Sequence, residues 1–167
     1  EKARFVTFSN DNVAINGKPY TVQLLAADTA FFHFFTYPLS GTPMKAPNDV
    51  LVTRQFAERV FGKENPIGEK LSYSGGHLLT VCGVLDEPAC KSSLTFDIVL
   101  NLELKNGERG WGRMLVELIR FMPGVDVDAI NAMSNIYRQS NAGYRVRYEF
   151  SHVSELYWNK SLAAKAD

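Results

Sequence analysis

The chain has 167 residues, of which 46% are hydrophobic and 22% are charged. A chain of this length can bury a core without a metal or a disulfide, so we expect one globular domain or two small lobes. Eighteen basic residues balance eighteen acidic ones, so no net charge attracts nucleic acid or anionic lipid, and we expect no nucleic-acid partner. The sequence contains no run of about 18 apolar residues that could span a bilayer. The sequence opens at Glu1-Lys2-Ala3 in the middle of a residue pattern and ends on Lys165-Ala166-Asp167. We therefore expect both ends to be cut edges of a larger protein.

The first part of the chain predicts a β-hairpin followed by a short aromatic helix. Residues 4–9 alternate large apolar and polar side chains, as a half-buried strand does. Asn16-Gly17 favours a tight turn because both residues tolerate positive φ, and the second strand is expected to end near Ala26. Asp28 precedes the apolar stretch 29–35. We expect its carboxylate to cap that helix, and at least three of the four phenylalanines there to be buried.

The next segment predicts a loop, a strand and a capped helix. Residues 37–48 contain three prolines and a glycine, which is typical of a loop. Residues 50–52 predict a short strand, and Thr53 is the expected N-cap of an amphipathic helix. Gly62 stands where a left-handed residue is needed to end this helix. The expected buried face consists of Phe56, Ala57, Val60 and Phe61.

The rest of the chain predicts further strands and one more helix. An Asn-Pro-Ile-Gly turn at 65–68 leads into a hairpin, in which Gly83 indicates a bulge or a close backbone approach. The predicted elements are hairpin strands at 69–73 and 78–86, strands at 95–102, 113–122 and 144–150, and a helix from Asp126 to about Gln139. This order predicts an α+β fold with mixed β-sheets and a few helices.

No group of residues has the spacing of a catalytic or metal-binding site. His33, His77 and His152 are far apart in the sequence, and none has a second ligand at helical spacing. We expect His33 to be a core or edge side chain of the aromatic helix. Asp126 and Asp128 could act as paired carboxylates, but their place at a helix start accounts for them better. We therefore expect no catalytic residue, no cofactor-binding residue, no metal ligand and no enzyme activity.

Three further patterns are better accounted for by structure than by chemistry. Ser74-Gly75-Gly76 lacks the following helix of a phosphate-binding loop, so we interpret it as a hairpin turn. Basic and aromatic residues alternate at 144–148, which could bind single-stranded nucleic acid, but a two-faced strand fits a neutral chain better. Cys82 and Cys90 form no CxxC pair. They could form a disulfide, or they could be one buried and one loop thiol.

Several motifs occur in the order found in one known family. An aromatic helix, a strand and a helix ending in Phe-Gly, an Asn-Pro-Ile-Gly turn and a Val-x-Gly-Val strand follow one another. They stand at Asp28–Phe35, Val50–Thr53, Phe61-Gly62, Asn65–Leu71 and Val81–Val84, with later matches at Ser92–Ile98 and Pro123–Asp126. In this arrangement the chain resembles the periplasmic core domain of MacB/FtsX-type ABC-transporter permeases.

The resemblance implies a domain inserted between the first two transmembrane helices of a permease in the inner membrane of a Gram-negative cell. Its partners would be the permease transmembrane helices of the same chain, a cytoplasmic ATPase subunit, a second permease copy and a periplasmic partner protein. It also implies two lobes: a porter-like βαβ lobe from residues 1–49 and 89–167, and a smaller β-rich lobe inserted at 50–88. We expect hinges at the crossings near 48–49 and 87–88.

The resulting prediction is a non-catalytic domain that couples cytoplasmic ATP hydrolysis to export or extraction of a substrate. An alternative is the extracytoplasmic ligand-sensing domain of a membrane receptor, which would show a small-molecule pocket and tight binding by the isolated domain. A soluble enzyme is a third alternative. It would lose activity when a single His or Asp is changed, and no such residue stands out in the sequence.

Overall fold

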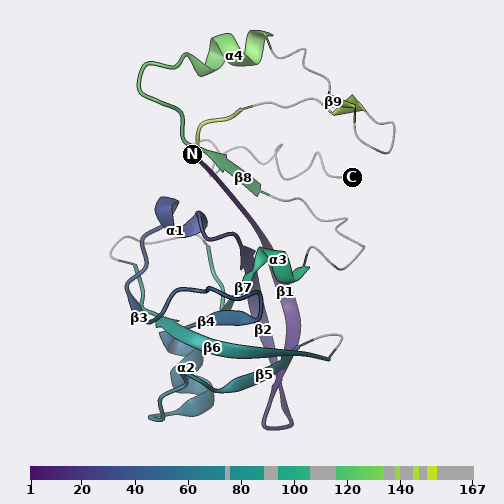
Figure 1. Ribbon diagram of the computed structural model, residues 1–167, viewed down its shortest axis with the longest axis vertical. Coiled ribbons are helices and arrows are strands. Elements are labelled where there is room, and N and C mark those ends of the chain that lie inside the picture. Colours follow the sequence, from purple (N-terminus) through teal and green to yellow (C-terminus); the bar gives the residue numbers. More distant parts are fainter. Residues whose placement is uncertain are drawn as a thin grey trace. The chain divides into compact units, whose positions relative to one another are not determined.

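The structure is a computed structural model that describes residues 1–73, 76–88, 94–105, 116–133, 138–139, 145–146 and 150–153. The chain forms two compact units, residues 1–119 and 120–167. Figure 1 shows the elements. They are β1 Lys2–Ile15, β2 Lys18–Ala27, α1 Phe31–Phe34, β3 Leu39–Gly41, β4 Asp49–Thr53, α2 Arg54–Phe61, β5 Lys70–Tyr73, β6 His77–Leu85, β7 Ile98–Asn101, α3 Leu102–Lys105, β8 Val116–Ile119, α4 Val127–Met133, β9 Arg138–Gln139 and β10 Arg145–Val146.

The sheet of the first unit contains a closed ring of strands. The strands follow the order β2-β7-β4-β6-β5-β1, and β1 also pairs with β2, so the ring closes. β2 pairs with β7 and β4 with β6 in parallel, whereas the other pairs are antiparallel. β8 adds to the start of β1, and β3 adds to the end of β6. The mixed sheet with few helices confirms the α+β class predicted from the sequence.

The long strand β1 is bent by a β-bulge. Phe8 pairs with Leu24 and Asp11 with Val22, so β1 has one residue more than β2 between these pairs. Asn10 absorbs the extra length with a φ of 59°, a conformation that asparagine tolerates better than most residues. Beyond the bulge, Asn16 and Gly17 have φ values of 50° and 77°. This geometry confirms the predicted hairpin turn.

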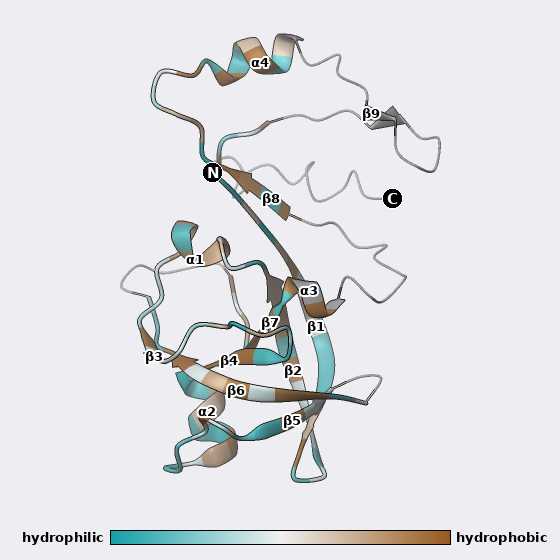
Figure 2. Ribbon diagram, viewed as in Figure 1, coloured by the Kyte–Doolittle hydropathy of each residue, from teal (hydrophilic) through white to brown (hydrophobic). Residues whose placement is uncertain are grey.

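The buried side chains form two clusters on the two faces of the sheet. Successive residues of one strand go to opposite clusters: Val50 and Val52 to the first, Leu51 to the second. β4 and β7 have apolar side chains buried on both faces, which explains their unbroken runs of Val, Leu and Ile. Figure 2 shows that α2, in contrast, carries both hydrophilic and hydrophobic residues.

Helix α2 begins and ends as the sequence predicts. The Thr53 hydroxyl oxygen accepts a hydrogen bond from the Phe56 amide at 3.3 Å. Phe56 and Ala57 are buried, and Val60 and Phe61 pack partly buried against the same cluster. The helix ends at Gly62, whose φ is 64°.

The region around α1 differs from the prediction in three ways. Asp28 does not cap the helix, because its Oδ2 accepts hydrogen bonds from the Arg4 backbone N and Nε at 3.0 and 3.3 Å. Phe31 alone of the four phenylalanines is buried; the other three are half-buried against the second cluster. Residues 39–41, expected in a loop, form β3 because the end of β6 offers them an unpaired edge.

The second unit contains α4 and two short paired strands, β9 and β10. The Asp126 carboxylate caps α4 by accepting a hydrogen bond from the Ala129 amide at 3.0 Å, as predicted. The Asn131 side chain both donates to the Phe150 carbonyl and accepts from the Phe150 amide, at 2.7 and 2.9 Å. The prediction that this helix continues to Gln139 was wrong, because residues 138–139 pair as β9.

The boundary between the two compact units differs from the lobe boundaries predicted from the sequence. Strands β4, β5 and β6, which lie in 50–88, share the ring with β1, β2 and β7. The first compact unit ends at residue 119 and the second begins at residue 120. The two lobes predicted from the sequence, residues 1–49 with 89–167 and residues 50–88, remain a prediction. Within the described residues, no helix has the length and apolar character needed to cross a bilayer.

Candidate functional site

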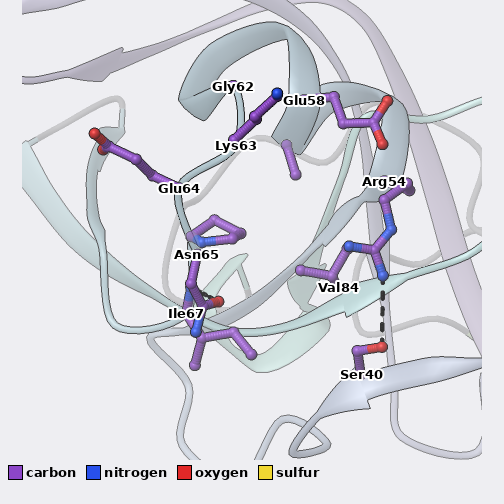
Figure 3. A pocket seen from close by; sticks show the side chains of 11 residues that line it. Ser40, Arg54, Glu58, Gly62, Lys63, Glu64, Asn65, Ile67 and Val84 are labelled. Atoms are coloured by element: carbon purple, nitrogen blue, oxygen red, sulfur yellow. Dashed lines mark hydrogen bonds between the residues drawn. The ribbon is translucent and has the colours of Figure 1, made fainter.

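A surface groove of about 760 Å³ lies between α2, the loop that follows it and the ends of β3 and β6. Ala57 and Val84 contribute buried apolar surface, and Ile67 is 39% exposed. Figure 3 shows the lining side chains, with Arg54 directed towards Ser40. The groove is lined by Ser40, Arg54, Ala57, Glu58, Gly62, Lys63, Glu64, Asn65, Pro66, Ile67 and Val84.

Arg54 is held at one side of the groove by Asp86. Its Nε and one terminal nitrogen donate to the two carboxylate oxygens of Asp86, at 2.8 and 3.3 Å. This forked contact raises the pKa of Arg54 above its usual value, and Glu58 adds a weaker effect in the same direction. The same contact lowers the pKa of Asp86. The guanidinium therefore stays charged, but its charge is already matched within the domain.

The loop that forms the other side is fixed by its own hydrogen bonds. The Asn65 side chain accepts from the Ile67 amide at 3.2 Å. The Gly68 amide donates to the Val81 carbonyl at 2.8 Å, and the Val81 amide donates to the Glu69 carbonyl at 3.0 Å. These contacts confirm the turn predicted at residues 65–68. They also hold Ile67 in one place, although its side chain faces solvent.

Two glycines next to the lining residues Ser40 and Val84 cross at close range. A Cβ on Gly41 would lie 2.6 Å from the Cys82 carbonyl oxygen and 2.8 Å from the Gly83 Cα. A Cβ on Gly83 would lie 3.0 Å from the Ser40 carbonyl oxygen. This confirms the close backbone approach predicted for Gly83. The register of β4 against β6 also shifts between Val50 and Leu51, which places a bulge in β6 at Cys82.

Asp97 connects α2 to the ring, and no catalytic or binding pattern in the sequence singles it out. Its Oδ2 accepts from the Gln23 amide at 2.8 Å, and its Oδ1 accepts from Arg59 Nη2 at 2.9 Å. Its backbone N–H donates to the Gln23 carbonyl, and its carbonyl accepts from the Thr53 amide. One residue thus joins β2, the start of α2 and the last turn of α2. Asp97 belongs to the Ser92–Ile98 motif, and membership in that motif is the one sequence feature that could have drawn attention to it.

None of the histidines considered for chemistry is among the residues that line the groove. The His33 side chain is 65% exposed, and its Nδ1 lies 2.6 Å from Glu1 Oε1, so the expectation of a core or edge position was wrong. His77 is half-buried at the start of β6, and His152 is exposed. Among the residues that the structure describes, no three His, Cys, Asp or Glu side chains gather in a way that could hold a metal ion.

Other sequence patterns fall partly outside the described residues. Ser74 and Gly75 of the Gly-rich turn lie outside, as do Tyr144, Arg147 and Tyr148 of the alternating segment and Cys90. Cys82 is a half-buried free thiol that donates to the Val50 carbonyl at 3.3 Å. Burial raises its pKa to about 11.

The ring of strands, α2 and the groove beside it define the first unit as a mixed α+β domain. The chain belongs to the MacB-like periplasmic core domain family, whose model matches residues 2–134. The resemblance inferred from the motif order is thereby confirmed.

Three solved structures have the same fold. The chain is similar to a domain assigned to a permease protein of Porphyromonas gingivalis, with 19% identity, a TM-score of 0.64 and coverage of 95% of this chain and 78% of the other. It is similar to the periplasmic region of MacB from Actinobacillus actinomycetemcomitans (14%, 0.62, coverage 81% and 64%). It is also similar to the extracellular domain of the noncanonic ABC-type transporter YknZ from Gram-positive bacteria (16%, 0.58, coverage 80% and 70%). No curated protein sequence is significantly similar to the chain.

Proposed function

We propose that this chain is the periplasmic domain of an ABC-transporter permease subunit, anchored in the inner membrane by helices of the same polypeptide. In this proposal the domain couples ATP hydrolysis in the cytoplasm to export or extraction of a substrate. The observation that carries the proposal is the family match over residues 2–134. The three structures support it through their shared fold.

The domain's own contribution would be mechanical. A cytoplasmic ATPase subunit would hydrolyse ATP, and the membrane helices would pass the movement to the domain through β1. This strand pairs with β2, β5 and β8, so a force on it is shared by three neighbours. A ring of strands connected in this way moves as one body more readily than it deforms. A second permease copy would supply the opposing domain.

The first test is the hydropathy of the gene on both sides of the sequence. We expect one apolar run of about 20 residues before Glu1 and three after Asp167. A single helix on each side, followed by a signalling domain, would contradict the proposal and select the ligand sensor instead.

The second test uses the full permease with its ATPase subunit in proteoliposomes. We expect a permease in which this domain is replaced by a Gly/Ser linker to bind ATP normally but to lose transport. Membrane insertion of the variant is checked by protease protection. Transport at the wild-type rate by a correctly inserted variant would refute the coupling role.

A further inference from the structure

The groove beside α2 has charged side chains that the domain itself does not pair. Arg54 is matched by Asp86, but within the described part of the chain the Glu58 and Glu64 carboxylates and the Lys63 ammonium group have no hydrogen bond or ion pair. The lining itself holds two basic side chains, Arg54 and Lys63, and two acidic ones, so its formal charge is zero. Because Asp86, outside the lining, neutralises Arg54, the charged lining side chains left without an ion pair are two carboxylates and one ammonium group. Figure 3 shows the two free carboxylates coming from different elements, Glu58 from α2 and Glu64 from the loop.

Ile67 is the exposed apolar side chain of the groove lining, and its loop is ordered. Ile67 is 39% exposed, and it projects from a loop in which the neighbouring residue Pro66 is buried. The Asn65 side chain and the Gly68 amide fix the loop on both sides of Ile67. An exposed aliphatic side chain on a pre-ordered loop loses little conformational entropy when a partner covers it, which favours binding.

We propose that this groove docks a segment of a partner protein that presents an aliphatic side chain next to a lysine or arginine. The aliphatic side chain would pack on Ile67, Ala57 and Val84. The basic side chain would pair with Glu58 or Glu64. The groove presents two unpaired carboxylates against one unpaired ammonium group, which is the reason to expect a basic segment rather than an acidic one. The inference rests on the proposed function, because it names the surface through which the domain would contact a periplasmic partner.

The test uses a phage-displayed library of linear peptides as the probe. The library is selected on the 167-residue chain and, in parallel, on its Ile67→Ser variant. We expect peptides with an aliphatic residue beside Lys or Arg to be enriched on the wild-type chain but not on Ile67→Ser. Leu78→Ser is the matched control, since Leu78 is 52% exposed but lies outside the groove. This control should enrich the same peptides as the wild type.

The charge prediction is measured with one enriched peptide by isothermal titration calorimetry. We expect the double variant Glu58→Gln/Glu64→Gln to weaken binding about two- to fivefold, since the partly solvated ion pair with Glu58 or Glu64 is lost. Added salt should reduce the difference between this variant and the wild type. Glu69→Gln removes an exposed charge outside the groove and should change the dissociation constant less than about twofold. Circular dichroism confirms that each variant is folded.

Several results would overturn the docking proposal. These are enrichment of acidic peptides, equal enrichment on Ile67→Ser, no enrichment on any chain, or an affinity that Glu58→Gln/Glu64→Gln leaves unchanged. Sedimentation analysis adds one more: a wild-type dimer that Ile67→Ser dissociates would make a second copy the occupant. None of these results affects the transport test, so failure of the docking site is distinguishable from failure of the proposed function.

Discussion

Asp97 is the residue whose replacement tests the construction of the first unit most directly. Its carboxylate bonds the Gln23 amide and the Arg59 guanidinium at 2.8 and 2.9 Å. Replacement by alanine removes both contacts, while the two backbone hydrogen bonds of Asp97 stay possible. Replacement by asparagine keeps an oxygen that can accept from the Gln23 amide but removes the charge. The two variants therefore separate the hydrogen bond from the ion pair.

The expected cost follows from the exposure of each contact. A hydrogen bond to a charged acceptor contributes about 1.5–3 kcal/mol, and we take the lower end because water can reach the Gln23 amide. Arg59 is 55% exposed, so its ion pair contributes only about 0.5 kcal/mol. We expect Asp97→Ala to lower the free energy of unfolding by about 2 kcal/mol and Asp97→Asn by about 1 kcal/mol.

The measurement is urea unfolding of the 167-residue chain, followed by far-ultraviolet circular dichroism, which reports the sheet. Arg59→Gln is the control for the ion pair and should lower the unfolding free energy by about 1 kcal/mol, because it also removes the contact of the guanidinium with the Phe56 ring. If Asp97→Ala costs no more than Arg59→Gln, the carboxylate does not hold β2 to the segment before β7, and the role assigned to Asp97 is wrong. Equal costs for Asp97→Ala and Asp97→Asn would contradict the retained hydrogen bond.

Three further predictions concern single positions in the first unit. Thr53→Ala should lower the free energy of unfolding by about 1 kcal/mol in urea titrations, because α2 loses its N-cap. Thr53→Ser keeps a hydroxyl and should retain most of the stability. If Thr53→Ala and Thr53→Ser lower the free energy of unfolding equally, the hydroxyl does not act as a cap. Gly41→Ala should lower the free energy of unfolding by about 3 kcal/mol because the new Cβ meets fixed backbone atoms. Gly62→Ala is the comparison: Gly62 has a φ of 64° but no atom within 4 Å of a new Cβ, so this variant should lower the free energy of unfolding by only about 1 kcal/mol. A larger loss for Gly62→Ala than for Gly41→Ala would refute the close crossing of Gly41 over β6. Cys82, with its pKa raised to about 11 from 9.0, should react about 100-fold more slowly with iodoacetamide at about pH 8 than a thiol of ordinary pKa. That rate, measured in the Cys90→Ser chain, should rise as the pH approaches the pKa of about 11; a fast reaction at the lower pH would show an accessible thiolate.

The elements that the sequence predicted correctly are those whose cause is local. The Asn16-Gly17 turn needs only two residues that tolerate positive φ, and both have it. The N-cap Thr53 and the glycine at the helix end bracket α2 through contacts within four residues. Gly83 was recognisable because a glycine inside an apolar strand commonly marks a bulge or the close approach of another backbone.

The features that the sequence did not predict depend on residues far apart in the chain. Asp28 has the sequence position of a helix cap, but its carboxylate accepts a hydrogen bond from the backbone amide of Arg4, 24 residues away. β3 forms because β6 runs past the end of β5 and leaves part of its edge unpaired. Asp97 acquires its role only when strand pairing places Gln23 beside it. No local pattern contains these partners, so only the assembled sheet reveals them.

The candidate groove follows the same rule. Each side has a local cause, a capped helix and a glycine-terminated turn, and both were predicted from the sequence. The third part of the lining, Ser40 and Val84, was not predicted, because these two residues lie side by side only through the pairing of β3 with β6. The sequence therefore indicated both sides of the groove but not the groove itself.

The closed ring also bears on where the domain could flex. A hinge at residues 48–49, as expected from the sequence, would have to strain β4, which pairs with both β6 and β7 directly after that point. Asp49 further resists movement, because its carboxylate accepts the amides of Lys45 and Ala46 at 2.8 Å. Bending there would break several of these bonds at once, and the whole ring lies within one compact unit, residues 1–119. The ring therefore favours movement of the first unit as one body, and in the proposed function β1 would be the element through which force enters.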